Sequence, residues 1–319
     1  MSSSTRTTTN RTTTNRSPRR LLRAGAVAAG LALALTACSS DSGTQGGAPD
    51  AAGATTAQTD PVRIGVVGAS DDQWRIFEEK AEAAGIPVEI IDFTEYSLPN
   101  PALTEGELDL NQFQHILYLA QYNVEAGEDL VPIGATAVYP LGLYSQQYES
   151  VEDIPEGGEI AVPNDPTNLA RALLVLQDAG LVTLRDGGSA FSTEADILAD
   201  ESRVKVIPVD AQQTALALDS VAASIINNDF LADAGIDPDS VLFADDASSP
   251  AARPYINIWV ARAEDAQNPT YLKLVEIYKD QEVQDAVLAA SGGTGVLADQ
   301  TPAELAEILA EVEEDARNR

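Results

Sequence analysis

The sequence predicts an α/β protein with two lobes. Short apolar, β-rich segments alternate with segments of helical hydrophobic spacing, which is the pattern of βαβ units. This pattern starts at residue 62 and again at residue 159, and a late strand-like segment at 256–261 follows the second series. We therefore expect two βα lobes that are joined by crossover segments near residues 141–147 and 244–254.

The first βαβ unit opens the predicted folded part. The apolar run 62–67 ends at Gly68 and predicts a buried strand. Residues 71–84 carry apolar side chains at helical spacing and stop at Gly85, and residues 88–91 predict the next strand. Because the strands of a βαβ unit are parallel, we expect a mostly parallel sheet. Further strands are predicted at 108–111, 130–133, 137–144, 159–162, 204–209, 222–226 and 256–261, and further helices at 116–126, 168–179, 212–218, 270–279, 281–291 and 302–317.

The composition excludes several classes of function. The 319 residues are 44% hydrophobic, enough for a core, and carry a formal net charge of −31. Such a surface repels nucleic acid, because phosphate binding needs clustered Lys and Arg. We expect the acidity to serve solubility, with a specific cationic partner as the alternative. The Glu-rich helix from Ala303 is expected to be a solvated face.

Cysteine and histidine are too scarce for several kinds of site. The chain has one Cys and one His. A disulfide within the chain is therefore impossible, and a zinc site of the usual Cys/His type lacks ligands. We expect no metal and no cofactor.

The N-terminal 61 residues are expected to export and anchor the protein. An apolar run at 24–35 is too short to cross a bilayer core of about 30 Å, so it predicts a signal peptide. The segment Leu35-Thr36-Ala37-Cys38 resembles the bacterial lipobox, in which the Cys is acylated and the chain is cut before it. We expect a lipoprotein signal peptide at 1–37, lipid attachment at Cys38 and a flexible tether at 38–61.

A polar cluster with an arginine indicates a ligand site. A predicted strand runs into Pro163-Asn164-Asp165-Pro166, and Thr167 or Asn168 can cap the helix that follows. Arg171 would lie in the first turn, at the positive end of the helix dipole, where a bound anion would compensate its charge. Guanidinium and free backbone N–H groups suit a carboxylate. The alternative is a structural ion pair between Arg171 and Asp165.

Several polar and aromatic segments follow one another along the chain. They are Tyr96-Ser-Leu-Pro-Asn-Pro-Ala-Leu, Gly106-Glu-Leu-Asp-Leu-Asn-Gln-Phe-Gln-His115, Val138-Tyr-Pro140, Ala161-Val-Pro-Asn-Asp-Pro-Thr-Asn-Leu-Ala-Arg171, Ile226-Asn227 and Pro254-Tyr-Ile-Asn257. In these segments the chain resembles the methionine-binding lipoproteins of bacterial ABC importers, the MetQ family of NlpA-type lipoproteins. The resemblance covers about residues 62 to 295, and the Phe-Gln-His and Pro-Asn-Asp-Pro-Thr-Asn segments are its specific parts.

The resemblance implies a two-lobed periplasmic-binding-protein fold, type II-like, with a ligand cleft between the lobes. Arg171 would clamp the ligand carboxylate, and three Asn side chains would hydrogen-bond the amino-acid head. Aromatic side chains with His115 would form the side-chain pocket, which suits a polarisable thioether. We expect His115 to pack and hydrogen-bond rather than to act as a base. The implied ligand residues are Tyr96, Phe113, His115, Tyr139, Asn164, Arg171, Asn227 and Asn257.

The resemblance implies a lipid-anchored receptor on the outer face of the cytoplasmic membrane. It would capture L-methionine, or D-methionine or Met-containing dipeptides, and deliver it to the permease and ATPase of an ABC importer. We expect no enzymatic activity and no nucleic-acid partner. The expected domains are a first lobe at 62–142 and 249–319, which includes the C-terminal helices, and a second lobe at 143–248.

Two departures from the family pattern leave the exact ligand open. The family often has Asn-x-x-Tyr where this chain has Asn227-Asn-Asp-Phe230, which lacks a hydroxyl, and Glu-Ser-Pro where it has Ala252-Arg253-Pro254. The alternatives are a receptor for another amino acid or small solute, or a surface interaction protein on the same fold. A hydrolase or lyase on this scaffold would need an activated nucleophile or a metal.

Overall fold

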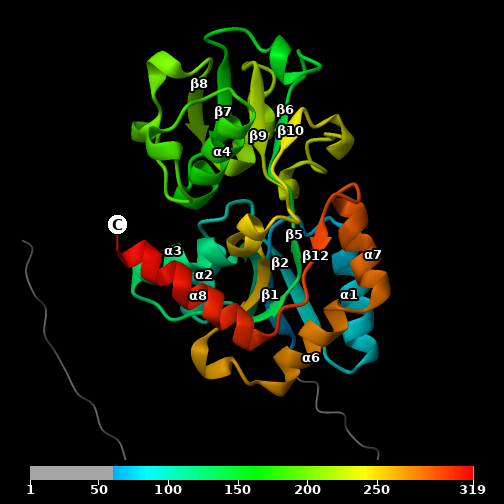
Figure 1. The fold of residues 1–319 in the computed structure, drawn as a ribbon. Coiled ribbons are helices and arrows are strands. Elements are labelled where there is room, and N and C mark those ends of the chain that lie inside the picture. The colour runs from blue at the N-terminus through cyan, green and yellow to red at the C-terminus, as the bar shows by residue number, and fades with distance from the viewer. Residues whose placement is uncertain (1–59, 319) are drawn as a thin grey trace, which may run out of the picture. The chain divides into compact units, whose positions relative to one another are not determined.

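The computed structural model describes residues 60–318, which lie within one compact unit, residues 57–319 (Figure 1). The predicted signal peptide, the lipid attachment site Cys38 and nearly all of the predicted tether lie outside the described residues. Among the described residues, no helix combines the length and the apolar character that crossing a membrane requires.

The first sheet has five strands in the order β2-β1-β3-β11-β4. They are β1 (Val62–Val66), β2 (Val88–Asp92), β3 (Leu110–His115), β4 (Val131–Ala135) and β11 (Asn257–Ala261). Strand β1 pairs in parallel with both β2 and β3, whereas β11 is antiparallel to both β3 and β4. Four of the five strands therefore run in the same direction, so the prediction of a mostly parallel sheet is confirmed except for the reversed β11. The chain returns to this sheet from the second lobe, and β11 enters from the opposite end.

The second sheet has the order β10-β6-β9-β7-β8. Its strands are β6 (Gly142–Tyr144), β7 (Glu159–Pro163), β8 (Lys205–Val209), β9 (Ala223–Ile226) and β10 (Phe243–Ala244). Strand β7 is parallel to β8 and β9, but β6 is antiparallel to β9 and β10. This sheet is therefore also mixed, and β10 was not predicted.

A single strand predicted at 137–144 is divided between two sheets. Strand β5 (Ala137–Val138) pairs antiparallel with the unpredicted β12 (Val296–Leu297), whereas β6 belongs to the second sheet. Residues 139–141 between them carry the chain from one lobe to the other, as Figure 1 shows. The predicted crossover near 141–147 thus begins two residues earlier, and the lobe boundaries at 142/143 and 248/249 remain our proposal.

Strand β11 separates the two halves of the first lobe's core. Ile258 and Val260 belong to a cluster with α2 (Pro99–Thr104), α3 (Ile116–Ala126) and α8 (Pro302–Arg317). Trp259 belongs to the opposite cluster, which contains Trp74, Phe77 and Tyr278 from the other helices. The alternation follows the twofold period of a strand. These other helices are α1 (Asp72–Ala83), α6 (Pro269–Tyr278) and α7 (Gln281–Ala290).

The C-terminal helix α8 is amphipathic, so the expectation of a solvated face is only half right. Its four core side chains, at helical spacing, are Leu305, Ile308, Leu309 and Val312. None of the Glu side chains of the helix belongs to this set, and they share the remaining positions with Ala, Asp and Arg residues. Thr301 caps the helix, since its hydroxyl accepts from the backbone N–H of Glu304 at 3.3 Å.

The second lobe has α4 (Pro166–Asp178) packed on its sheet, with Leu173 and Leu176 in the core beside Ile160 and Ile225. The helix predicted at 212–218 is shorter, since only Thr214–Ala217 (α5) is α-helical. Short 3-10 segments occupy Val151–Asp153, Arg185–Gly187, Glu194–Asp196, Ala199–Glu201, Ala211–Gln213, Asn228–Phe230, Pro238–Ser240, Pro250–Tyr255 and Ala263–Asp265.

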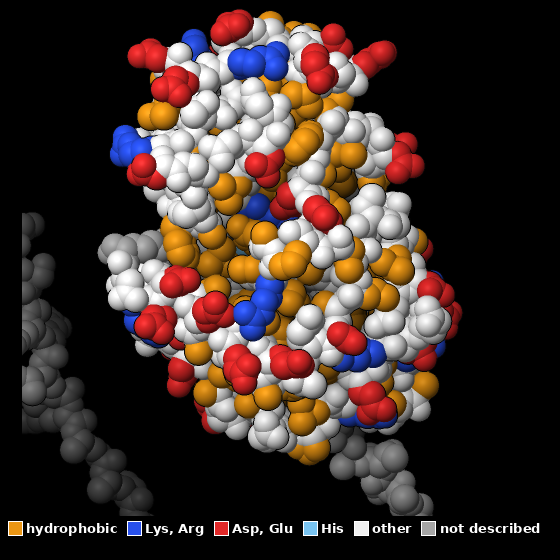
Figure 2. Space-filling model, viewed as in Figure 1, with side chains coloured by type: hydrophobic (Ala, Val, Ile, Leu, Met, Phe, Trp, Pro, Cys, Tyr) orange, Lys and Arg blue, Asp and Glu red, His pale blue; other side chains and the backbone are white. Residues whose placement is uncertain are grey.

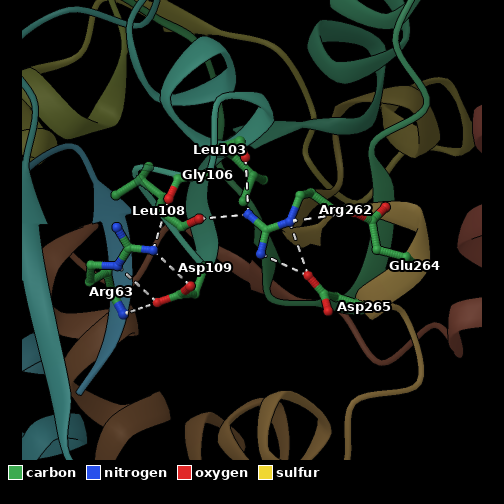
Figure 3. Close-up of polar contacts among 8 residues, drawn as sticks. All are labelled: Arg63, Leu103, Gly106, Leu108, Asp109, Arg262, Glu264 and Asp265. Atoms are coloured by element: carbon green, nitrogen blue, oxygen red, sulfur yellow. Dashed lines mark hydrogen bonds and ion pairs between the residues drawn. The ribbon is translucent and has the colours of Figure 1, made fainter. Parts of the chain in front are cut away.

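Two arginines fasten the amino ends of β1 and β3. Arg63 donates to both carboxylate oxygens of Asp109, at 3.1 and 3.0 Å (Figure 3). Arg262 donates to the backbone oxygens of Leu103 and Leu108 at 3.1 and 2.7 Å and pairs with Asp265 at 2.7 Å. Because these contacts lie at the amino ends of the parallel strands, they stabilise the first lobe away from the edge where its strands finish.

Candidate ligand-binding site

The cavity of interest lies where strands of both sheets end. Strand β3 ends at His115, which is in register with Asn257 at the start of antiparallel β11. In the second sheet, β9 ends at Ile226, in register with Gly142 at the start of β6. Ligands of open α/β sheets bind beyond the carboxyl ends of the strands. The antiparallel strands β11 and β6 begin at those same edges, so their first residues also lie beside the cavity.

The cavity is narrow: the space free of atoms is about 440 Å³ when the opening to solvent is included, but only about 30 Å³ of it is wide enough to hold the centre of a water molecule. Figure 2 shows that hydrophobic side chains gather around the hollow between the lobes on the face in view, while acidic side chains are spread over both lobes. The residues that line the cavity are Tyr96, Phe113, Gln114, His115, Tyr118, Tyr139, Pro140, Leu141, Asn168, Arg171, Asn227, Asn228, Asp229 and Asn257. All of the predicted ligand residues except Asn164 are among them.

Arg171 is the only one of the cavity-lining side chains with a fixed positive charge, and it is 5% exposed. Its Nε donates to Asp245 Oδ2 at 2.7 Å, and its Nη2 donates to the carbonyl of Tyr139 at 2.8 Å. The guanidinium carbon lies 4.2 Å from the centre of the Tyr255 ring. In the described part of the chain, Nη1 has no hydrogen-bond acceptor. The arginine is thus held rigidly with one donor group left for a ligand.

The helix around Arg171 differs from the prediction in two respects. Helix α4 begins at Pro166, so Arg171 lies in its second turn, where the dipole acts weakly. Asp165 is the N-cap, and its Oδ1 accepts from the backbone N–H of Asn168 at 3.0 Å. The predicted caps, Thr167 and Asn168, are therefore wrong, as is the alternative pairing of Arg171 with Asp165. The ion-pair partner is Asp245 from the second crossover, which the sequence analysis did not identify.

His115 is neutral and structurally fixed. Its Nδ1 accepts from the backbone N–H of Tyr118 at 3.1 Å and caps α3. Burial, with the positive charge of Arg171 as the second cause, lowers the pKa of His115 to about 3. Because Nδ1 is an acceptor, the proton of the neutral ring is on Nε2, which is buried without a partner among the described residues. The side chain of Asn168, which also lines the cavity, lies close to this ring and acts to raise the pKa of His115 by hydrogen bonding, although burial outweighs it.

The aromatic wall of the cavity is continuous. The Tyr96 ring lies 6.0 Å from that of Phe113 and 6.1 Å from that of Tyr118. Phe230, the residue at which the chain lacks the family's hydroxyl, packs against Tyr96 at 5.2 Å. Offset and edge-to-face contacts of this kind are favourable for aromatic rings. The wall suits an apolar, polarisable group.

The asparagines differ in their surroundings. Asn227 donates through Nδ2 to Asn168 Oδ1 at 3.0 Å, but its own Oδ1 is buried without a partner in the described residues. Asn257 lies beside His115 at the start of β11. Asn164 lies outside the cavity, is exposed and donates to Asp210 Oδ1 at 2.7 Å. A ligand role for Asn164 therefore receives no support from this geometry.

Sequence reasoning missed Asp229, Tyr118 and Asn168 as lining residues. Asp229 accepts a hydrogen bond from the Tyr96 hydroxyl through Oδ2 at 2.6 Å. Burial, with the nearby carboxylate of Asp71 as a further cause, raises the pKa of Asp229 to about 7. Its position three residues after the end of β9 was the available signal, because polar residues near strand ends face the cleft.

Comparison with known proteins identifies the family. The model of the NlpA lipoprotein family matches residues 62–298. The chain belongs to the NlpA lipoprotein family. A relative called D-methionine-binding lipoprotein MetQ, from Yersinia pestis, is 36% identical over 249 residues, which are 76% of this chain and 90% of the relative. The lipoprotein names in this family indicate a membrane-anchored, extracytoplasmic protein.

Solved structures of other members share the fold. The substrate-binding protein of a methionine transporter from Streptococcus pneumoniae is 37% identical, with a TM-score of 0.69 over 75% of this chain and 95% of that one. A nutrient-binding protein from Burkholderia cenocepacia, solved bound to methionine, is 33% identical, with a TM-score of 0.69 over 74% of this chain and 99% of that one. The predicted two-lobed binding-protein fold is thereby confirmed.

The chemistry of this NlpA-family cavity is that of binding. Within residues 60–318, no group of three or more His, Cys, Asp and Glu side chains could hold a metal ion. The cavity instead combines one clamped cation, unpartnered amide and imidazole groups and an aromatic wall. Such a set can bind a small zwitterion with an apolar side chain.

Proposed function

We propose that this chain is the solute receptor of an ABC importer and captures L-methionine, with D-methionine or Met-containing dipeptides as further ligands. The observation that carries this proposal is the pairing of Arg171, with its free Nη1, and an aromatic wall in one cavity. Arg Nη1 suits the ligand carboxylate, and the rings of Tyr96 and Phe113 suit a thioether. The methionine-bound relative supports the same ligand class.

In this proposal Asn164 loses its predicted role and His115 moves from the side-chain pocket to the carboxylate site, whereas the other predicted ligand residues keep their roles. Arg171 and the Nε2 of His115 bind the carboxylate, and Asn227 and Asn257 hydrogen-bond the amino-acid head. Tyr96, Phe113 and Tyr139 surround the side chain. The protein performs no chemistry on its ligand, in keeping with the transport role of its relatives.

The partners and the location belong to the same proposal. Acylation at Cys38 would hold the receptor at the outer face of the cytoplasmic membrane, and residues 38–61 would let it reach its permease and ATPase. Bound ligand would be released to that permease when the lobes open.

Calorimetry on the full-length protein in detergent tests the ligand. We expect stoichiometric binding of L-methionine and no binding of alanine or glutamate, because alanine lacks the thioether chain and glutamate would bury a second carboxylate against the aromatic wall. D-Methionine and Gly-Met, titrated in the same way, show whether the site accepts the other stereoisomer or a dipeptide. If another amino acid binds and methionine does not, the methionine assignment is wrong but the receptor class stands.

A further inference from the structure

Asp229 lines the same cavity as Arg171, the predicted carboxylate clamp, and is not used in the proposed function. It belongs to the turn after β9 in the second lobe, whereas its partner Tyr96 precedes α2 in the first lobe. The 2.6 Å hydrogen bond between them therefore spans the two lobes beside the ligand space.

The carboxylate of Asp229 has no positive partner within the described chain. None of the ion pairs of residues 60–318 includes it, and the charged group that acts on it is the carboxylate of Asp71. Asp71 is itself desolvated and close to Asp233, and its pKa is raised to about 6. A desolvated carboxylate is costly to ionise unless a cation pairs with it. The site therefore lacks one positive charge, which a ligand can bring.

The polar groups of the cavity are divided by kind. Arg171 Nη1 and His115 Nε2 are donors. These two side chains lie near each other, because both contact the ring of Tyr255: the His115 ring meets it edge-on at 5.3 Å, and the guanidinium of Arg171 lies over it. The turn after β9 instead supplies acceptors, namely the unpartnered Oδ1 of Asn227 and the carboxylate of Asp229. One set suits an anion and the other a cation, as in the head of a free amino acid.

We propose that the Asp229 carboxylate binds the α-ammonium group of the ligand and selects solutes with a free amine over isosteric solutes without one. This inference rests on the proposed function, because it assumes an amino-acid ligand. Pairing with the ammonium would supply the missing positive charge while the Tyr96 hydroxyl keeps the carboxylate in place. Ligand binding would thereby also strengthen the contact between the lobes.

The test compares two ligands of nearly equal shape. L-Methionine and 2-hydroxy-4-(methylthio)butanoate share the carboxylate and the thioether, but the second has a hydroxyl in place of the ammonium. Calorimetry at pH 8 would be run on the full-length protein and on Asp229→Asn. Asp233→Asn is the matched control, since it removes a carboxylate four residues away that bonds Ser70 and does not line this cavity.

We expect the native protein to prefer methionine, and Asp229→Asn to weaken methionine binding by about 10- to 100-fold, as for loss of a charged partner in a desolvated site. Binding of the hydroxy acid should change by less than about threefold, and Asp233→Asn should keep the native preference. Equal weakening of both ligands, or no change for methionine, would overturn the proposal. Thermal unfolding of each variant would show that it is folded.

Failure of the proposed function would look different. A native protein that binds neither compound would refute the methionine assignment. The same comparison would then use the amino acid found by calorimetric screening and its α-hydroxy counterpart. A preference for the amine that survives Asp229→Asn would still refute the role of Asp229.

Discussion

The guanidinium of Arg171 is bound on its inner side by Asp245, with Nε–Oδ2 and Nη2–Oδ1 distances of 2.7 and 3.1 Å. Asp245 also accepts from the backbone N–H of Leu141 at 2.8 Å, so one carboxylate joins both crossover segments to the candidate ligand clamp. The side chain of Asp245 is 22% exposed and that of Arg171 is 6% exposed. A geometry of this kind fixes the direction in which the remaining Nη1 donor can act.

Replacing Arg171 by Lys should weaken methionine binding by at least about tenfold, although the charge is kept. A lysine ammonium cannot make the paired bonds to Asp245 and still present a planar donor to a carboxylate. Calorimetry measures the change. Arg253→Lys is the control, because Arg253 is an exposed partner of Glu311. Unchanged affinity in Arg171→Lys would show that the ligand does not engage this guanidinium.

His115 should stay neutral throughout the physiological range. Its pKa is lowered to about 3 in the folded state, so the folded protein does not take up the proton that the unfolded chain accepts near pH 6.5. The suppressed protonation of His115 therefore lowers the free energy of unfolding as the pH falls below about 6.5. The chain has one His, so NMR of the untagged protein can follow its ring signal without ambiguity. A titration midpoint near 6.5 would contradict the burial of this ring.

Asp229→Asn should stabilise the ligand-free protein at pH 8. The pKa of Asp229 is raised from 3.8 to about 7, so the folded state holds this proton more tightly than the unfolded state. Its contribution to stability is present below about pH 4 and is lost as the pH rises toward 7. We expect the variant to gain about 1–3 kcal/mol in the free energy of unfolding at pH 8 and almost nothing at pH 4. Urea unfolding at both pH values measures this difference.

The reference for that comparison is Asp219→Asn, which removes an exposed carboxylate of the same lobe and should give the same change at both pH values. An equal gain at both pH values would mean that the effect comes from packing and not from ionisation. A gain at pH 8 together with weaker methionine binding would indicate that the site gives up stability for ligand recognition.

Arg262→Met should destabilise the protein by about 2–3 kcal/mol, because it leaves the carbonyl oxygen of Leu108 without its donor and removes one of the donors to Leu103. Urea unfolding measures the loss, and Arg75→Met is the control, since Arg75 is an exposed helix residue. The affinity for ligand should stay within about twofold, because the network in Figure 3 lies at the amino ends of the strands. A large loss of affinity without a loss of stability would contradict this separation.

The sequence by itself determined the local structure and the kind of side chains at the site. Hydrophobic periods gave α1 and α3 to within a residue of their observed ends, because those periods follow from local backbone geometry. Polar residues soon after a strand end, such as those near Asn227, indicated the cleft, because ligands of open α/β sheets bind beyond the ends of the strands. The family resemblance added candidate ligand residues.

Only the tertiary structure decided the sheet directions and the charge partners. Strand β11 and strand β6 are antiparallel because the chain crosses between lobes before them, which no local pattern records. Asp245 is 74 residues from Arg171 along the chain, and Asp229 is 133 residues from Tyr96. Whether a charged group is buried, and what lies beside it, depends on such distant contacts, and these set both the clamp on Arg171 and the unpaired carboxylate of Asp229.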